Sequence, residues 1–170
     1  MDWIDQFISV LFVSGLISLP LFFIFSIKYS YLGHIKYRGV LRISTGVFVI
    51  SILGIFLLSE ILSYYSYQVT MDFLADIGEG YEITVDGVKE DDGAKILSIL
   101  QSMDNSPFQA HHSHPTKRIK FAIKSHGESL ELELGKDSER PNEYWVFYPK
   151  YKHTRANEIS RVRTSIFERY

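Results

Sequence analysis

The hydrophobic positions of this chain form two kinds of pattern, long uncharged runs near the start and short alternating segments afterwards. The first run covers residues 6–27, which are 22 residues without a charge. The second covers 43–59 and extends through Glu60 to about residue 64. At a rise of about 1.5 Å per residue, both runs are long enough as helices to cross a hydrocarbon core of about 30 Å.

Neither run has the polar face that a surface-packed helix of a soluble protein carries, so we interpret 6–27 and 43–64 as transmembrane spans. A cleaved signal peptide is disfavoured because Asp2 and Asp5, and no basic residue, precede the first run. Small residues that favour close helix packing lie in both runs: Ser14, Ser18, Gly46 and Gly54. Residues 1–67 are therefore predicted to form a transmembrane hairpin.

Basic residues predict the orientation of this hairpin. The loop 28–42 contains Lys28, Lys36, Arg38 and Arg42, whereas no Lys or Arg precedes residue 28 or lies between residues 43 and 88. Because cytoplasmic loops are enriched in Lys and Arg, we expect this loop in the cytoplasm and both termini outside it. The expected location is a bacterial inner membrane, with the C-terminal domain in the periplasm.

The rest of the chain predicts a small domain of α+β class over 81–170, joined to the membrane by a connector over 68–80. Alternation of apolar and polar residues predicts strands over 81–87, 118–124 and 130–134, and an aromatic run that stops at Pro149 predicts another over 144–148. Apolar residues at helical spacing predict a helix from Asp91 or Asp92 to Met103. We expect a mostly antiparallel sheet of about four strands, with one or two helices packed on one face.

The register of the central hairpin follows from two independent patterns. Pairing positions whose numbers sum to 253 places Ile123 opposite Leu130 on the apolar face. The same register places Lys120 opposite Glu133 on the other face. Since the apolar and charged residues select one register, this pairing is predicted directly.

The last segment, 157–169, has two interpretations. Apolar residues at 159, 162, 166 and 167 favour an amphipathic helix. A strand over 158–164 is the alternative.

Composition excludes several classes of function. The chain has 170 residues and no cysteine, so disulfides, thiol catalysis and cysteine metal sites are excluded. Residues 68–170 contain 14 basic and 17 acidic residues. This balance is unlike the basic surface of a nucleic-acid-binding protein, so we expect no nucleic-acid partner.

Three histidines raise the possibility of a metal site. His111, His112 and His114 lie in one polar segment, and imidazole nitrogens bind zinc and copper. In an extended chain His112 and His114 project to the same side, and a third ligand could come from His126, His153 or a carboxylate. The histidines do not follow a known metal-binding motif, and a solvated polar loop is the simpler interpretation. A zinc- or copper-binding sensor or carrier domain is therefore the alternative function.

No catalytic motif is found in the sequence. Ser113, or Ser138 beside Asp137, lacks the Gly-x-Ser-x-Gly context of a nucleophilic serine. The acidic residues between Glu131 and Glu143 are interpreted as solvated side chains rather than as a glycosidase pair. We therefore do not predict an enzyme.

The segment around the aromatic strand is the best candidate for recognition. Tyr and Arg are enriched among residues that dominate protein interfaces, and loops often carry them. We predict a partner-binding set of Arg140, Tyr148, Tyr151 and Arg155, with Trp145 and Phe147 in the core. The predicted function is a non-enzymatic, membrane-tethered module that binds another protein outside the cytoplasm, as an envelope-complex subunit or an immunity or inhibitor-type protein does.

Overall fold

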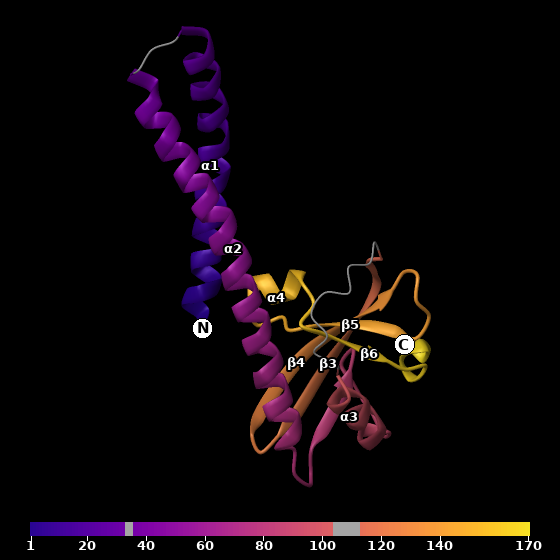
Figure 1. The fold of residues 1–170 in the computed structure, drawn as a ribbon. Helices are drawn as coiled ribbons and strands as arrows, with labels where there is room; N and C mark the ends of the chain where they lie inside the picture. The colour runs from indigo at the N-terminus through magenta and orange to yellow at the C-terminus, as the bar shows by residue number, and fades with distance from the viewer. Residues whose placement is uncertain (33–35, 104–112) are drawn as a thin grey trace. The chain divides into compact units, whose positions relative to one another are not determined.

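The computed structural model describes residues 1–32, 36–103 and 113–170 and divides into two compact units, 1–62 and 63–170 (Figure 1). The long helix α2 contributes residues to both units, because its range includes the boundary.

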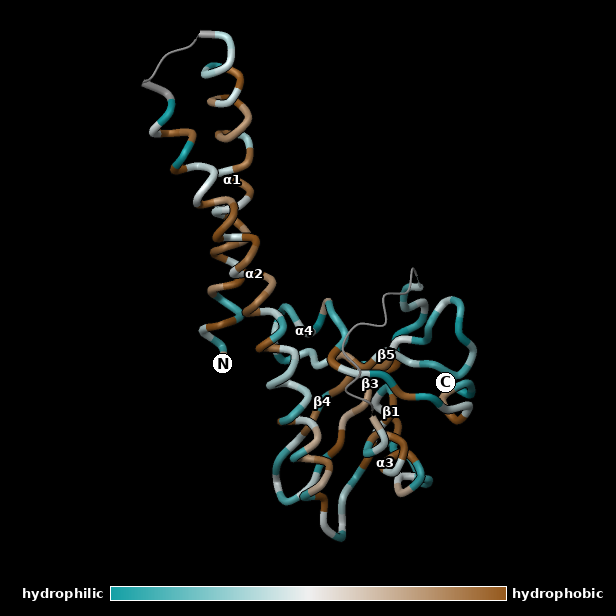
Figure 2. Tube along the Cα trace, in the orientation of Figure 1, coloured by the Kyte–Doolittle hydropathy of each residue, from teal (hydrophilic) through white to brown (hydrophobic). Residues whose placement is uncertain are grey.

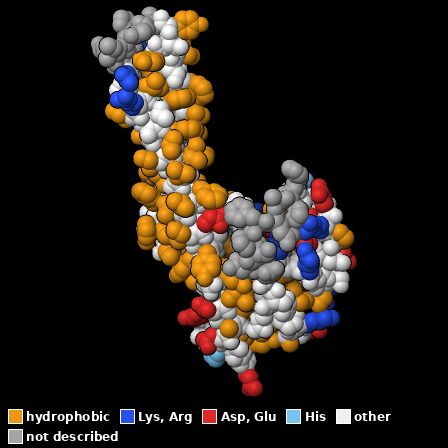
Figure 3. All heavy atoms as spheres, viewed as in Figure 1, with side chains coloured by type: hydrophobic (Ala, Val, Ile, Leu, Met, Phe, Trp, Pro, Cys, Tyr) orange, Lys and Arg blue, Asp and Glu red, His pale blue; other side chains and the backbone are white. Residues whose placement is uncertain are grey.

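The first unit consists of helix α1 (Asp2–Leu32) and most of helix α2 (Lys36–Ala75). Both helices are long and apolar enough to cross a membrane, by length and composition. Only 11% and 17% of their most apolar windows are buried, so most apolar side chains point outwards. Figure 3 shows these hydrophobic side chains along the surface of the unit.

Small residues lie where α1 and α2 approach each other. The hydroxyl oxygens of Ser14 and Ser51 are 3.0 Å apart. A Cβ atom added at Gly54 would lie 2.8 Å from a methyl carbon of Leu11. The predicted role of small residues in helix packing is therefore confirmed for Ser14 and Gly54, whereas Gly46 faces open space.

The second unit contains a six-stranded antiparallel sheet with the order β2-β1-β3-β4-β5-β6 (Figure 1). Its strands are β1 (Glu82–Val85), β2 (Val88–Lys89), β3 (Pro115–Ser125), β4 (Glu128–Asp137), β5 (Glu143–Phe147) and β6 (Ser160–Arg163). Its helical elements are α3 (Gly93–Gln101), α4 (Lys152–Ala156) and the 3-10 helix η1 (Ile166–Arg169), besides the end of α2.

The structure confirms the antiparallel α+β architecture and the register of the β3–β4 hairpin. Ile123 pairs with Leu130 and Lys120 pairs with Glu133, as predicted. The expected number of about four strands was too low, because β2 and β6 were not assigned as strands.

The helix preferred for 157–169 is wrong, and the strand alternative is right. Residues 160–163 form β6, and η1 is the only helical element after it. Val162 is buried, while Arg161 and Arg163 on the opposite face both contact Glu143 of β5. This alternation is that of a strand paired with β5.

One face of the sheet carries the core of the domain. Its fully buried residues include Ile83, Phe121, Ile123, Leu132, Leu134, Tyr144 and Val146. Phe167 of η1 packs edge-on against Phe121 and Tyr144, with ring centroids 5.1 and 5.4 Å apart. Figure 2 shows the hydrophobic residues of these strands and of α3 in brown.

The end of α2 belongs to this domain. Leu74 is fully buried. Its carbonyl oxygen accepts a hydrogen bond of 2.8 Å from the side chain of Gln101, the last residue of α3. The Tyr67 hydroxyl donates to the carbonyl oxygen of Met103. Residues 68–75 of the predicted connector are therefore helical and packed in the domain.

Candidate functional site

The second face of the sheet carries polar and aromatic side chains. Because side chains alternate between the faces of a strand, neighbours of the core residues point to this side. They come from β3 to β6 and are Arg118, Glu133, Asp137, Glu143, Trp145, Phe147, Arg161 and Arg163.

A glycine lets two apolar side chains cover the backbone of β4 on this face. A Cβ atom at Gly135 would lie 2.6 Å from Pro115 and 3.1 Å from the Phe147 ring. Both distances are shorter than ordinary carbon contacts, so only glycine fits without displacement. Phe147 is 1% exposed as a result of this packing.

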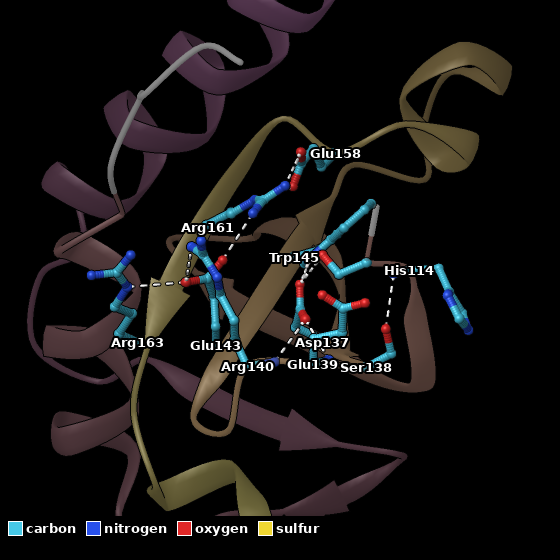
Figure 4. A network of polar contacts seen from close by, with 11 residues as sticks. His114, Asp137, Ser138, Glu139, Arg140, Glu143, Trp145, Glu158, Arg161 and Arg163 are labelled. Carbon is cyan, nitrogen blue, oxygen red and sulfur yellow. Dashed lines mark hydrogen bonds and ion pairs between the residues drawn. The ribbon is translucent and has the colours of Figure 1, made fainter. Parts of the chain in front are cut away.

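Asp137 ends β4 and is a buried hydrogen-bond acceptor (Figure 4). One oxygen accepts from the backbone N–H groups of Glu139 and Arg140 at 2.8 and 3.0 Å. The other accepts from the Trp145 indole at 2.7 Å and the Ser113 hydroxyl at 2.8 Å. Burial raises the pKa of Asp137, but these four hydrogen bonds outweigh it and hold the pKa well below its usual range.

Glu143 begins β5 and is surrounded by three arginines (Figure 4). Its carboxylate accepts from Arg161 at 2.8 Å, from Arg163 at 3.1 Å and from Arg140 at 3.4 Å. The Glu143 side chain is only 3% exposed. Burial raises the pKa of Glu143, but the hydrogen bonds from Arg161 and Arg163 outweigh it and lower the pKa.

Two arginines stack on the aromatic rings of β5. The Arg118 guanidinium lies 4.0 Å from the centre of the Phe147 ring, and that of Arg161 lies 4.6 Å from the Trp145 ring. The two rings stack on each other with centroids 6.4 Å apart. Arg118 also donates to the carbonyl oxygen of Arg155.

These contacts join five arginines into one surface, which we call the arginine face: Arg118, Arg140, Arg155, Arg161 and Arg163. Its buried part is held by Glu143, Glu133 and Glu158, each of which forms an ion pair with a member. The Arg163 side chain is 70% exposed and that of Arg140 is 38% exposed. The guanidinium groups of Arg163 and Arg140 are therefore accessible to solvent, while the residues beneath them are held by ion pairs.

The structure divides the four residues predicted to bind a partner into two pairs. Arg140 and Arg155 belong to the arginine face, where Arg155 also donates to the carbonyl oxygen of Pro149. Tyr148 and Tyr151 are 6% and 5% exposed and pack against each other with ring centroids 5.8 Å apart. The two tyrosines therefore contribute to the interior of the domain in this structure.

The predicted metal site falls mostly outside the described residues. His111 and His112 lie in the segment 104–112, which the structure does not describe. His114 is exposed, and its backbone N–H donates to the Ser138 hydroxyl at 3.1 Å. Its imidazole points away from Asp137 (Figure 4). Within 1–32, 36–103 and 113–170, no group of three His, Asp or Glu residues is arranged to hold a metal ion.

The described serines near Asp137 do not form a hydrolase triad. Ser113 donates directly to the Asp137 carboxylate, whereas a nucleophilic serine donates to an imidazole. The expectation that the acidic residues of this region are solvated is wrong for Asp137 and Glu143, which are 4% and 2% exposed. Both instead organise the arginine face.

Sequence reasoning did not assign Glu143, Arg161 or Arg163 to a site. The signal was the alternation Arg161-Val162-Arg163, in which an apolar residue between two arginines is typical of a strand with one charged face. The helix interpretation of 157–169 placed both arginines on an outer helix face and did not predict their ion pairs with Glu143.

Comparison with protein-family models, with curated proteins and with solved structures finds no match to this chain.

Proposed function

We propose that this protein is a membrane-anchored recognition module, whose arginine face binds an acidic surface on a partner protein outside the cytoplasm. One observation carries the proposal. The Arg163 guanidinium is exposed to solvent, whereas the adjacent arginines of the same face are held in place by Glu143, Trp145 and Phe147. Arginines and aromatic residues dominate the energetics of protein interfaces.

The arrangement favours binding because the arginines are already ordered. An arginine held by a carboxylate or an aromatic ring loses less side-chain freedom when a partner binds. Guanidinium groups donate to carboxylates in pairs of parallel hydrogen bonds. An acidic partner surface is therefore the complementary ligand.

Stability alone gives a poor account of all three arginines around Glu143. Arg161 is 14% exposed and makes the shortest ion pair with this carboxylate, at 2.8 Å. Arg163 and Arg140 are 70% and 38% exposed, and their ion pairs with Glu143 are longer, at 3.1 and 3.4 Å, so each is expected to contribute less to stability than Arg161. The two exposed arginines are thus better suited to recognition than to stabilisation.

The membrane part of the proposal rests on the exposed apolar surface of α1 and α2 and on the charge of the loop between them. Large apolar surfaces exposed on a helical hairpin are stable in lipid rather than in water. Four basic residues within 28–42 support a cytoplasmic loop, and with it a sheet domain on the other side of the membrane, which is the periplasm in a bacterium.

Chemical cross-linking in native membranes tests the binding surface. We expect the wild-type protein to form a defined adduct that the Arg140→Ala, Arg163→Ala double variant reduces by about tenfold, because two charge-assisted contacts are lost. The control is the Lys95→Ala, Lys150→Ala double variant, which removes the same charge from exposed positions elsewhere in the domain. Equal adduct yields from the two variants would contradict the proposal.

Orientation is tested by cysteine labelling, which is unambiguous because the chain has no cysteine. A membrane-impermeant maleimide should label an Asp91→Cys variant in intact spheroplasts. A Ser30→Cys variant should react only after lysis. Labelling of the Ser30→Cys variant before lysis would reverse the topology.

A further inference from the structure

A groove lies between the end of α2 and the turn of the β3–β4 hairpin, at the opposite end of β4 from Asp137. It has a volume of about 560 Å³, within the range of small-molecule sites. Figure 3 shows acidic side chains beside a histidine at this end of the domain. The groove is separate from the arginine face.

Three carboxylates line this groove, namely Asp72 of α2, Asp76 just after the end of α2, and Glu128 of β4. Asp72 and Asp76 are one helical turn apart, a spacing at which like charges repel. No basic side chain in the described part of the chain forms an ion pair with any of the three. The groove therefore carries negative charge that the domain leaves uncompensated.

A buried hydroxyl supplies a second, independent sign of a ligand. Ser125 lines the groove and is 8% exposed. Its Oγ atom is buried and has no hydrogen-bond partner among the described residues. Since an unsatisfied buried hydroxyl destabilises a folded domain, a ligand that donates to it would remove a penalty of the unliganded domain.

The wall of the groove is held in place by the hairpin turn. His126 and Gly127 both have positive φ, 51° and 81°, as a two-residue hairpin turn requires. A Cβ atom added at Gly78 would lie 2.7 Å from Nε2 of His126, so the chain after α2 passes directly against the imidazole. The position of the turn relative to the end of α2 is thus fixed by contact.

We propose that this groove binds an organic cation, a primary ammonium or guanidinium group on an aliphatic stem. Val69 and Phe73 provide an apolar wall for the stem, and the carboxylates provide acceptors for the charged end. A divalent metal fits less well, because no three His, Asp or Glu side chains of the described residues converge on one point. In this proposal the Ser125 hydroxyl accepts a hydrogen bond from an N–H of the ligand's ammonium or guanidinium group.

The cation has two possible sources, a lysine or arginine of a basic peptide and a free polyamine. Both have the same chemistry, and a binding experiment distinguishes them. The inference goes beyond the proposed function, since it concerns a second site of opposite charge at the other end of β4.

Calorimetric titration of the intact protein in detergent micelles tests the site. The probes are spermidine and a capped tetralysine peptide, and sodium chloride is the control for ionic strength. We expect saturable one-to-one binding of at least one probe, weakened by salt because the carboxylates are near the surface. Stronger binding of the peptide would assign the site to a protein segment, and stronger binding of spermidine to a free amine; either supports the site.

Charge-neutral variants locate the binding. The Asp72→Asn, Asp76→Asn double variant should weaken binding by about tenfold or more, which corresponds to about 1.4 kcal/mol. The matched control is Glu79→Gln, an exposed carboxylate beyond the groove. It should change the affinity by less than about twofold, since screening limits its contribution.

Ser125→Ala separates a binding role from a structural one. Removal of an unsatisfied buried hydroxyl should leave the thermal midpoint unchanged or raise it. The same change should weaken cation binding if the hydroxyl accepts from the ligand, and unchanged affinity would overturn its role.

Three outcomes would overturn the proposal as a whole. They are the absence of saturable binding to both probes, an equal loss of affinity in the Glu79→Gln control, and one-to-one binding of calcium or zinc in place of either amine.

Discussion

Buried carboxylates organise the second face of the sheet at the level of single residues. Asp137 accepts four hydrogen bonds, and Glu143 forms ion pairs with three arginines. Each carboxylate satisfies donors from separate elements, so the two residues connect β4, β5 and β6.

The Asp137→Asn variant tests this role. An asparagine can still accept the two backbone N–H groups, but its amide N–H₂ would face the Trp145 indole N–H, which is also a donor. We expect the free energy of unfolding to fall by about 1–3 kcal/mol. Urea unfolding followed by tryptophan fluorescence measures it, with Glu131→Gln, an exposed carboxylate of the same strand, as the control.

The lowered pKa values predict sensitivity to acid. Asp137 and Glu143 have ordinary pKa values of 3.8 and 4.5, and both values are lowered in the folded domain. Each carboxylate therefore stabilises the fold fully above its ordinary pKa, and this contribution is lost as the pH falls through the folded-state value. The free energy of unfolding should decrease below about pH 4.5, and less steeply in the Asp137→Asn variant. An equal slope in both proteins would contradict the prediction.

Gly135 should not tolerate a side chain. A methyl group at this position would meet Pro115 at 2.6 Å and Phe147 at 3.1 Å. We expect Gly135→Ala to lower the free energy of unfolding by about 1–3 kcal/mol, because overpacking displaces both rings. Ser129→Ala, at an exposed position of β4, is the control for thermal denaturation. Equal thermal midpoints for the two variants would contradict the prediction, because they would show that Pro115 and Phe147 can shift without loss of stability.

At the level of elements, small residues determine where α1 and α2 meet. Ser14 and Ser51 lie in contact, whereas Gly46 has no neighbour within 4 Å of an added Cβ atom. Packing of small residues brings two helices close enough for direct side-chain hydrogen bonds. The contact therefore predicts which pairs of positions can be cross-linked.

A Ser14→Cys, Ser51→Cys variant should form an intramolecular disulfide on mild oxidation, because the side-chain oxygens are 3.0 Å apart. The chain has no other cysteine, so mobility on a non-reducing gel reports this bond directly. A Ser14→Cys, Gly46→Cys variant should remain uncross-linked under the same conditions. Similar cross-linking in both variants would indicate a different helix contact.

At the level of the whole molecule, the division between the two units lies within α2. The sheet domain includes residues 63–75 of this helix, where Ser66, Thr70 and Leu74 are fully buried. Gln101 and Met103 also bond to this part of the helix. The domain core is therefore incomplete without the last turns of α2.

This division predicts the behaviour of two fragments. A fragment of residues 63–170 should be soluble and unfold cooperatively, because it retains the buried helix face. A fragment of residues 76–170 should expose apolar core residues, bind a hydrophobic dye and lose several degrees of thermal midpoint. Circular dichroism and dye fluorescence measure both properties, and equally stable fragments would place the domain boundary after α2.

The amino-acid sequence by itself determined the elements whose signals are local. Long uncharged runs predicted α1 and α2, alternation predicted β1, β3 and β4, and an aromatic run ending at Pro149 predicted β5. The β3–β4 register was also determined, because its strands adjoin and both faces carry a pattern. Local periodicity was sufficient in each case.

The tertiary structure alone decided the features that depend on distant partners. Residues 160–163 became a strand because β5 offers a free edge with Glu143 opposite Arg163, and short apolar patterns do not distinguish a helix from a strand. Asp137 and Glu143 were interpreted as solvated because part of their side-chain donors, such as Trp145 and Arg161, come from other elements of the fold. The acidic groove likewise joins α2 to a turn about fifty residues later, and only folding brings these side chains together.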